Sequence, residues 1–236
     1  MKTDTGVFDS MESAGFKILE SFYETEISDP FLSELDEELG VEKHGAGGIR
    51  FPHLKSRSIA RLLDSEKLRE LVASICGGRP ILIRSILFDK NDNANWLIPW
   101  HQDLTIAVRE KRVTRSFGPW SVKDGVCHVH APQEVLSQIL TIRVHLDDCP
   151  AENGALKVLP GSHLLGRLKK DQILQLSNES NPVVCEVARG GLLLMRPLLV
   201  HSSLPSDTPV HRRVLHLEFT SQELPGGLEW LPASSS

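Results

Sequence analysis

From Pro80 onward, short apolar segments are separated by turn-forming residues, and this pattern constrains the fold more than any other feature of the chain. The segment 140–146 alternates apolar and polar side chains with a period of two, as a strand with two different faces does. Further strands are predicted over residues 81–88, 154–160, 191–195 and 212–219. Because Gly, Pro, Asn and Asp separate these segments, the pattern indicates an antiparallel double-sheet barrel.

The first third of the chain is predicted to be mainly helical and to pack outside the barrel. A short strand over 15–19 precedes helices that begin at Asp29-Pro30, run over 57–63, and extend from Ser65 to Gly77-Gly78. With 236 residues and 40% hydrophobic content, the chain can bury a substantial core. We therefore expect a single domain over 1–236, with a helical part over about 1–79 and a barrel over about 80–220.

Residues 104–137 contain no segment that we interpret as a strand. A long connection in a compact domain is often functional, so we predict a lid loop over the mouth of the barrel. Its basic cluster, residues 109–115, either recognises a carboxylate or phosphate or forms a solvated loop, which we favour. Cys127, His128 and His130 are interpreted as a loop without metal, since a zinc site would need a fourth ligand. Alternatively, His128 or His130 lines the substrate pocket.

The charge balance and the absence of targeting features restrict the partners. A formal net charge of -5 disfavours a nucleic-acid-binding surface, which requires a basic stripe. The chain has no apolar run long enough for a membrane span and no apolar segment at its start for a secretory signal. Its four scattered cysteines are expected to be free thiols. These features predict a cytoplasmic protein without nucleic-acid or membrane partners.

The main chemical signal is Trp100-His101-Gln102-Asp103. Residues two apart on a strand point to the same face, so His101 and Asp103 should face one cavity. A histidine from another strand would complete a two-His, one-carboxylate triad, which suits Fe(II) because the opposite face of the metal stays open. Alone the motif is weak, because ten histidines produce such pairs by chance. The competing interpretation is an exposed Asp beside a partly buried His.

A second signal is His201 followed by Arg212. A dicarboxylate such as 2-oxoglutarate needs a partner for its distal carboxylate, and the bidentate fork of an arginine provides one. Arg212 and Arg213 lie on opposite faces of the predicted strand, so one of them should point inward. Taken alone, such a pair is more often surface charge.

A third signal extends from Glu152 to His163. Asn153-Gly154 favours a tight turn, and Pro160-Gly161-Ser162-His163 ends the strand that follows. His163 is interpreted as a structural loop residue rather than a metal ligand.

Together these motifs resemble the phytanoyl-CoA dioxygenase family of Fe(II)/2-oxoglutarate-dependent oxygenases, over about residues 15–219. The resemblance implies a mainly β fold with flanking helices, a double-stranded β-helix (jelly roll, cupin-like). It implies iron at His101, Asp103 and His201, and Arg212 on the 2-oxoglutarate carboxylate. It also suggests Ser203 as a second contact to the cosubstrate, although Ser202 replaces the glycine common before it.

The resemblance further implies an enzyme that consumes 2-oxoglutarate and O₂, hydroxylates a small organic substrate, and releases succinate and CO₂. The carboxylate of Asp103 favours hydroxylation over halogenation. Arg143 falls where relatives can have an aromatic residue that lines the site. It could contact the cosubstrate or an anionic substrate, or it could pair with Asp147. Trp96 and Trp100 flank the iron motif as core residues or as an aromatic wall of the substrate pocket.

Two other function classes are compatible with a barrel of this kind. One is a cupin-like metal enzyme that does not use 2-oxoglutarate and so needs no inward arginine near His201. The other is a non-catalytic ligand-binding barrel, against which the complete set of His101, Asp103, His201 and Arg212 argues. The expected partner is a free small molecule, since no extra domain for a CoA carrier is evident.

Overall fold

The computed structural model describes residues 5–40, 48–92, 94–123, 125–207 and 211–231. Its centre is two antiparallel sheets, which confirms the predicted double-sheet architecture. The larger sheet contains, in spatial order, β1 (Phe16–Leu19), β11 (Leu192–Met195), β8 (Leu140–His145), β13 (Arg212–Thr220), β3 (Ile81–Lys90) and β2 (Ile49–Arg50). The smaller sheet contains β10 (Val183–Cys185), β9 (Leu156–Val158), β12 (His201–Ser203) and β4 (Ile98–His101).

An apolar layer joins the inner faces of the two sheets at one end. Leu193 and Met195 of β11 belong to the same buried cluster as Leu156 and Val158 of β9. Leu192 and Leu194 of β11 point the other way, into the cluster that faces the helices. The strand therefore contributes to two cores, because successive side chains leave opposite faces.

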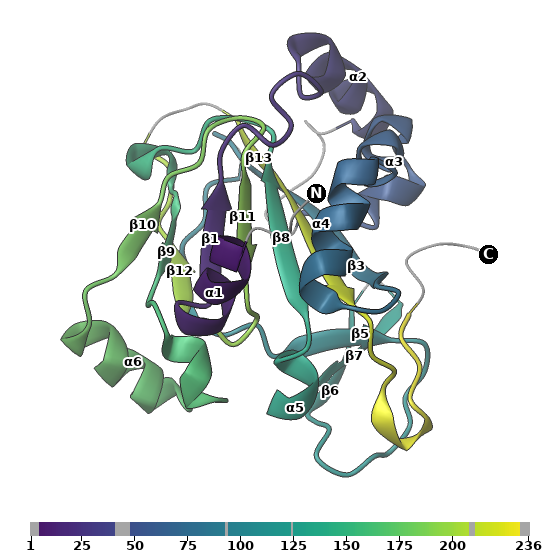
Figure 1. Cartoon of the computed structure of the whole chain (residues 1–236), viewed down its shortest axis with the longest axis vertical. Helices are drawn as coiled ribbons and strands as arrows, with labels where there is room; N and C mark the ends of the chain where they lie inside the picture. Colours follow the sequence, from purple (N-terminus) through teal and green to yellow (C-terminus); the bar gives the residue numbers. More distant parts are fainter. Residues whose placement is uncertain (1–4, 41–47, 93, 124, 208–210, 232–236) are drawn as a thin grey trace.

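Four helices cover the outer face of the larger sheet (Figure 1): α1 (Thr5–Ser13), α2 (Asp29–Leu39), α3 (Arg57–Leu63) and α4 (Glu66–Cys76). The three predicted helices are confirmed. The Ile59 amide donates to the Ser56 hydroxyl, which caps the start of α3. Ser65 precedes α4 as predicted, but its hydroxyl bonds to that of Tyr23 instead of capping the helix.

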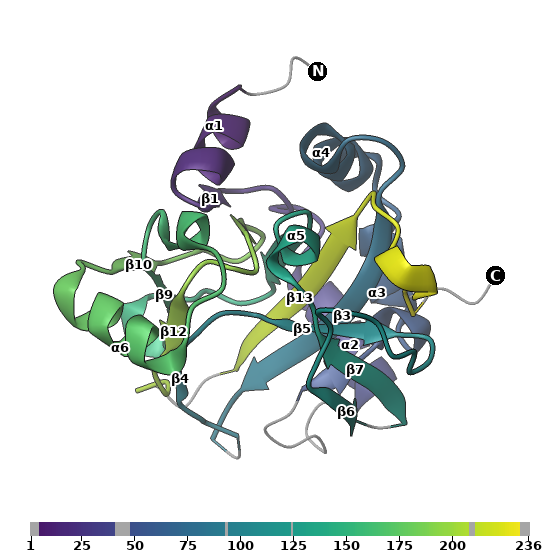
Figure 2. The ribbon, with the colours of Figure 1, turned by 90° about the horizontal axis from the view of Figure 1, so that it is seen from below.

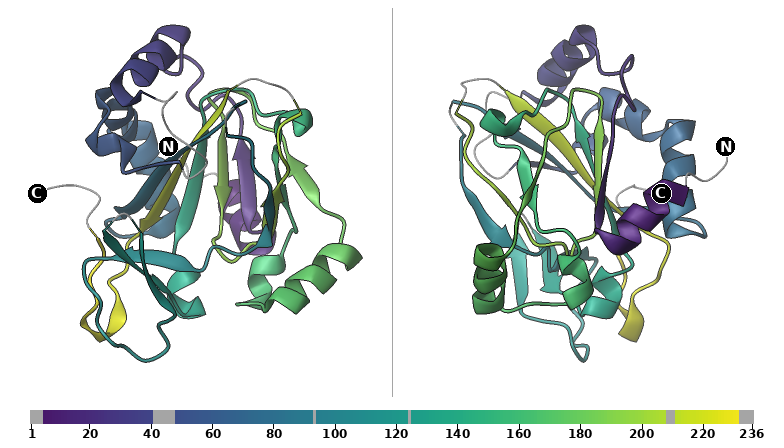
Figure 3. Two further views of the ribbon diagram at one scale, coloured as in Figure 1. Left: turned by 180° about the vertical axis from the view of Figure 1, so that it is seen from behind. Right: turned by 60° about the vertical axis from the view of Figure 1, so that its left-hand side comes forward.

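The other helices of the described residues are α5 (Gln133–Leu136) and α6 (Lys170–Glu179), with 3₁₀ turns at η2 (Pro52–Leu54), η3 (Ala151–Asn153), η4 (Ser162–Leu165) and η5 (Pro225–Gly227). Seen from two further sides, α6 lies away from α2 to α4, next to the smaller sheet (Figure 3). Within the described ranges, no helix is both long enough and apolar enough to span a bilayer.

Strand β8 contributes polar side chains to the space inside the double sheet. Its apolar residues, Ile142 and Val144, face the helices, and its polar residues, Thr141, Arg143 and His145, are also buried. The two predicted faces are therefore confirmed, but the polar face does not meet bulk solvent. It meets the inside of the double sheet, where buried polar groups need partners or a ligand.

The interpretation of residues 104–137 as a segment without strands is wrong. They form a three-stranded antiparallel sheet of β5 (Thr105–Val108), β7 (Val126–His130) and β6 (Trp120–Lys123), followed by α5. This sheet lies beside β3 and β13 when the molecule is seen from below (Figure 2). Ile106, Val108 and Val129 anchor it in an apolar cluster with Ile83 of β3. The expected lid role of this segment stays a prediction.

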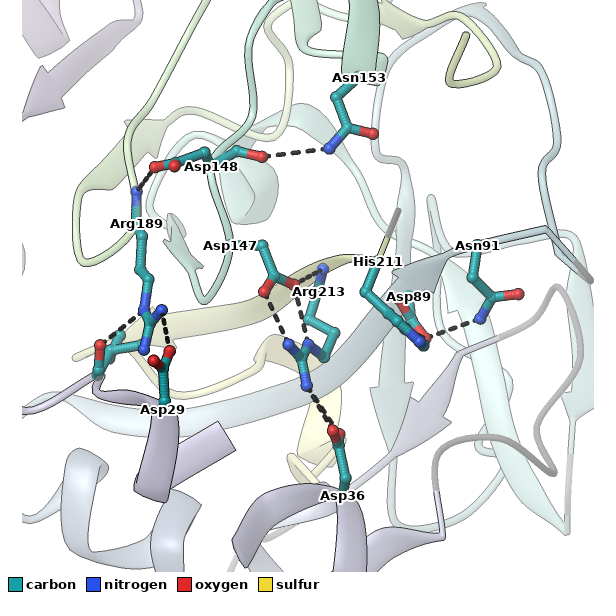
Figure 4. A network of polar contacts seen from close by, with 11 residues as sticks. Asp29, Asp36, Asp89, Asn91, Asp147, Asp148, Asn153, Arg189, His211 and Arg213 are labelled. Atoms are coloured by element: carbon teal, nitrogen blue, oxygen red, sulfur yellow. Dashed lines mark hydrogen bonds and ion pairs between the residues drawn. The ribbon is translucent and has the colours of Figure 1, made fainter. Parts of the chain in front are cut away.

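Arg213 joins the helical layer to the sheet (Figure 4). Its side chain is nearly buried and donates to both oxygens of Asp147 and to both oxygens of Asp36 on α2. Burial alone would lower its pKa, but these two carboxylates outweigh burial and raise it, so the guanidinium stays charged.

We expect Arg213→Leu to lower the free energy of unfolding by about 2–3 kcal/mol, because it leaves two carboxylates without a partner at the sheet–helix junction. Urea unfolding followed by circular dichroism measures this loss. Arg61→Leu is the control, because its pair with Glu34 is exposed and contributes about 0–1 kcal/mol. Equal stability of the two variants would show that the Arg213 network does not join the layers.

Candidate metal centre and its cavity

Two histidines face each other across neighbouring strands of the smaller sheet. His101 at the end of β4 is the direct partner of His201 at the start of β12. Asp103 lies two residues beyond His101, where its amide donates to the Pro197 carbonyl at 2.9 Å. Strand pairing and the short extension after β4 thus bring all three side chains together, as the sequence predicted.

The three side chains have a geometry that could hold one ion. The Asp103 carboxylate lies 3.6 Å from Nε2 of His101 through Oδ1 and 3.6 Å from Nε2 of His201 through Oδ2. One ligand atom from each residue lies within 4.8 Å of the others. Among the described residues, this is the one group of three or more His, Cys, Asp or Glu with such spacing.

Backbone carbonyls orient both imidazole rings. Nδ1 of His101 donates to the Pro99 carbonyl, and Nδ1 of His201 donates to the Leu199 carbonyl, each at 2.8 Å. A carbonyl only accepts, so the proton of each neutral ring lies on Nδ1. The lone pair of each Nε2 then faces the space among His101, Asp103 and His201. Metal-binding histidines usually donate their other ring N–H in this way, to a carbonyl or carboxylate.

The charges of the group also suit a cation. Burial would raise the pKa of Asp103, but His201 and His101 outweigh it and hold that pKa far below its ordinary value. Burial lowers the pKa of His201 to about 4, despite the nearby carboxylate. For His101, the carboxylate of Asp103 outweighs burial, and its pKa is raised. An ionised Asp103 and a neutral His201 are the forms that bind metal.

Gln102 explains why His101 and Asp103, two residues apart, point to the same side. Its side chain points away from the histidines and is buried, with Nε2 donating to the carbonyls of Leu198 and Gly166 and Oε1 accepting from the Leu168 amide. These bonds hold the segment extended after β4, so Asp103 stays on the same side as His101.

A buried basic group lies next to the triad on the larger sheet. Arg212 of β13 is the direct partner of Lys90 of β3, and both side chains are almost completely inaccessible. Nζ of Lys90 donates to the Ser203 hydroxyl at 2.9 Å, and that hydroxyl donates to the Gly154 carbonyl at 2.9 Å. Arg212 donates to the same carbonyl through NH1, and its Nε has no partner among the described residues.

Arg143 belongs to the same basic group. It lines the cavity, and burial and the proximity of Arg212 lower its pKa to about 10, so it stays charged at neutral pH. Its NH1 lies 3.4 Å from Nδ1 of His216, and its buried Nε has no partner in the described part of the chain. The proposed pair with Asp147 is wrong, because Asp147 is bound by Arg213 on the other face of the sheet.

Lys90 is the main site residue that the sequence analysis missed. It occupies the last position of β3, on the face that also carries Ile86 and Phe88, which line the cavity. Burial, with Arg212 and Arg143 nearby, lowers its pKa to about 7. Because Lys90 lies two residues after Phe88, a longer predicted strand would have placed it on the same face. The predicted strand ended at Phe88, and the observed strand ends at Lys90.

The triad opens into a cavity of about 310 Å³ between the sheets and the β5–β7–β6 sheet. His128, His130 and Trp96 line it, as one of the sequence alternatives proposed. Trp100 instead packs against the buried cluster of Leu159, Ile173 and Val200. The basic cluster of residues 109–115 lies outside the cavity, where Arg109 pairs with Glu229 and Arg112 pairs with Glu110.

His163 has the structural role predicted for it. Its Nε2 donates to the Glu12 carbonyl at 3.2 Å, and its ring packs against Gly15, at a turn that connects α1 to β1. It therefore joins the helical layer to η4 and contributes no ligand to the triad.

A protein-family model matches most of the chain. The profile of the family described as Phytanoyl-CoA dioxygenase (PhyH) matches residues 17–214, which include the triad and Arg212. None of the curated proteins compared matches the chain by sequence.

Solved structures with the same fold have low sequence identity to the chain. The epimerase SnoN, solved with Fe³⁺, alpha-ketoglutarate and nogalamycin RO, has a TM-score of 0.70 at 17% identity, covering 98% of this chain and 96% of that one. EctD from S. alaskensis, in its apoform, has a TM-score of 0.68 at 20% identity and coverages of 92% and 77%. AviO1 from Streptomyces viridochromogenes Tue57 has a TM-score of 0.63 at 18% identity, with coverages of 95% and 98%.

Proposed function

Because the chain belongs to the phytanoyl-CoA dioxygenase family, we propose that it is an Fe(II)- and 2-oxoglutarate-dependent oxygenase that hydroxylates a small organic substrate. The observation that carries the proposal is the close group of His101, Asp103 and His201 beside a buried, incompletely paired Arg212. The cupin-like alternative without 2-oxoglutarate leaves the burial of Arg212 unexplained.

The triad fits Fe(II). Two neutral imidazoles and one carboxylate on the same side of a site are the donor set of non-haem iron oxygenases, and they leave the remaining positions to cosubstrate and O₂. In the neutral form of each ring, the carbonyl bond to Nδ1 leaves Nε2 unprotonated and available to a metal. We therefore assign His101, Asp103 and His201 as the iron ligands.

The basic group next to the triad fits a dicarboxylate. Arg212, Arg143 and Lys90 bring three basic side chains into the barrel, and Asp103 is the one carboxylate among the described residues that line the cavity. Buried guanidinium nitrogens without partners are costly unless an anion completes their hydrogen bonds. We assign Arg212 and Ser203 to the distal carboxylate of 2-oxoglutarate, with Lys90 beside them, and Arg143 to the same cosubstrate nearer the iron.

When bound, iron with 2-oxoglutarate and O₂ supplies the oxidising power to hydroxylate a C–H bond, with succinate and CO₂ as coproducts. The protein's part is to position and to exclude water. Arg212 and Ser203 fix the orientation of the cosubstrate, and Asp103 keeps an anionic ligand on the metal. Phe88, Trp96 and Leu104 line the cavity and limit the access of water.

The proposal is tested by the visible charge-transfer band that Fe(II) and 2-oxoglutarate give when both bind one site. The purified protein is titrated with both under anaerobic conditions. We expect a band that saturates at one equivalent of iron. If iron binds and no band forms at saturating 2-oxoglutarate, the function proposed here is wrong.

The pKa of Lys90 predicts that 2-oxoglutarate binding takes up a proton above pH 7. Without ligand, burial, Arg212 on β13 and Arg143 on β8 lower this pKa to about 7, and the nearby Cys149 thiol has a raised pKa. At pH 8 the amine is therefore mainly neutral. A carboxylate bound beside it favours the ammonium form and raises its pKa. Affinity for 2-oxoglutarate should consequently fall as the pH rises above 7.

Anaerobic calorimetry at pH 8, in buffers with different ionisation enthalpies, measures this proton uptake in Fe(II)-loaded protein. Lys90→Met should remove most of it, because the pKa of Lys90 lies near 7 and the bound carboxylate would raise it. Equal uptake by the wild type and Lys90→Met would assign the proton to another group.

A further inference from the structure

A second set of basic side chains lines the cavity, on strands other than β8 and β13, which carry Arg143 and Arg212. We name Arg50 (β2), Arg84 (β3), Lys123 (β6) and His128 (β7) the outer basic cluster. All four line the same cavity as the iron triad. They lie near enough to one another that Arg84, Lys123 and Arg50 reinforce the effect of burial in lowering the pKa of His128.

The charge of this cavity is opposite to that of the chain. The chain has a formal net charge of -5. Among the described residues, the cavity is nevertheless lined by Arg50, Arg84, Lys123, Arg143 and Arg212, by five histidines, and by one carboxylate, that of Asp103. A dicarboxylate on Arg212 and Arg143 would compensate those two guanidinium groups and leave the Lys123 ammonium without a counter-charge among the described residues. Such a concentration of one sign of charge in a cleft attracts ligands of the opposite sign.

Two members of the outer basic cluster, His128 and Lys123, keep hydrogen-bonding groups that a ligand could use. Arg84 donates NH1 to Glu218 and NH2 to the Thr105 carbonyl, so its carboxylate partner compensates one charge. His128 donates from Nδ1 to the Val126 carbonyl, which leaves Nε2 for a ligand. The Lys123 ammonium is exposed and has no hydrogen bond or ion pair within the described residues.

Apolar side chains also line the cavity. They are Phe51, Ile86, Phe88, Trp96 and Leu104. At about 310 Å³ the cavity lies at the small end of the usual range for small-molecule sites, about 300–1,000 Å³. Part of this space is needed for the cosubstrate, so the substrate must be compact.

We propose that the substrate is a compact organic anion, a carboxylate or a phosphate monoester, whose charged end is held by the outer basic cluster and whose apolar part faces the triad. This inference rests on the proposed function, because it assumes that 2-oxoglutarate occupies the basic group around Arg212. An anion at the cluster would leave an apolar carbon near the iron ligands, where hydroxylation takes place.

Three aromatic probes of similar size test this inference: benzoate, phenyl phosphate and the neutral benzamide. Each is titrated into anaerobic protein saturated with Fe(II) and 2-oxoglutarate, and calorimetry and the change in the charge-transfer band are recorded. We expect one of the two anions to bind at least about tenfold more tightly than benzamide. The tighter anion identifies the group as carboxylate or phosphate. If benzamide binds as well as both anions, the inference is overturned.

Two variants link the preference to the cluster. Lys123→Gln, at an exposed position, should weaken binding of the preferred anion about fivefold and leave benzamide unchanged. Arg50→Gln should act in the same direction. Lys170→Gln, on exposed α6 outside the cavity, is the matched control and should change neither affinity. If Lys123→Gln and Arg50→Gln both bind the anion like the wild type, the cluster is not the site.

The charge-transfer band separates the two possible failures. A protein that binds iron but gives no band with 2-oxoglutarate fails the proposed function, and the substrate inference falls with it. A protein that gives the band but does not prefer the anionic probes fails the substrate inference alone.

Discussion

His201→Ala is expected to abolish formation of the Fe(II)·2-oxoglutarate charge-transfer band. His201 is the most buried member of the triad, and its ring is already oriented by the Leu199 carbonyl with Nε2 directed to Asp103. Loss of a group that hydrogen-bonds to a metal ligand typically weakens metal binding about 10- to 100-fold, and loss of the ligand itself should weaken it more than about 100-fold. Anaerobic titration with Fe(II), followed by metal analysis after desalting, measures this affinity.

His163→Ala provides the control for a histidine outside the site. His163 contacts the Glu12 carbonyl and Gly15, so its removal can lower stability but should leave Fe(II) affinity unchanged. His201→Ala protein that is folded and binds iron as tightly as the wild type would refute the ligand assignment. Circular dichroism of both variants verifies that any loss of iron is not a loss of fold.

Arg212→Leu is expected to weaken binding of 2-oxoglutarate far more than binding of iron. Truncation of one partner in a buried, hydrogen-bonded charge pair costs about 2–5 kcal/mol, which corresponds to a loss between about 30-fold and a few thousandfold. Arg212 is 2% exposed, and its Nε has no partner among the described residues, so a bound carboxylate would be its main anionic contact. Titration of the charge-transfer band with 2-oxoglutarate at fixed Fe(II) gives the affinity.

The neighbouring Arg213→Leu is the matched control for this experiment. It removes the same side chain one position along β13, but from the face that contacts Asp147 and Asp36. It should lower stability and leave the affinity for 2-oxoglutarate unchanged, the reverse of the effect of Arg212→Leu. If the two variants weaken 2-oxoglutarate binding equally, the effect of Arg212 is one of stability and not of recognition.

Several site residues could be predicted because their chemistry depends on local spacing. His101 and Asp103 share a face through the period of two along an extended segment, and Arg212 and Arg213 are separated onto opposite faces by the same rule. These relations need no information about distant strands. The same spacing places Lys90 on the face of Phe88, but its role depends on its pairing with Arg212, which is remote in the sequence.

The segment 104–137 was mispredicted for a related reason. Its strands are four or five residues long, and a long run of polar and charged residues separates β5 from β6. Short strands have little intrinsic preference, and they are stabilised by cross-strand contacts and by burial. Here Val129 and Ile106, direct partners on β7 and β5, supply that burial together with Ile83.

The sequence by itself determined most strands of the larger sheet, three of the outer helices and the shared face of His101 and Asp103, because each follows from spacing along one segment. Spacing also placed Arg212 and Arg213 on opposite faces of their strand, and the family resemblance singled out Arg212 and His201. Tertiary structure alone decided that Lys90, Arg143 and Arg212 share one buried basic group, and that the outer basic cluster brings together four strands. It also decided that Asp147 binds Arg213 rather than Arg143. The reason is that ion pairs and cavities depend on which strands become neighbours, and strand order is set by long-range packing.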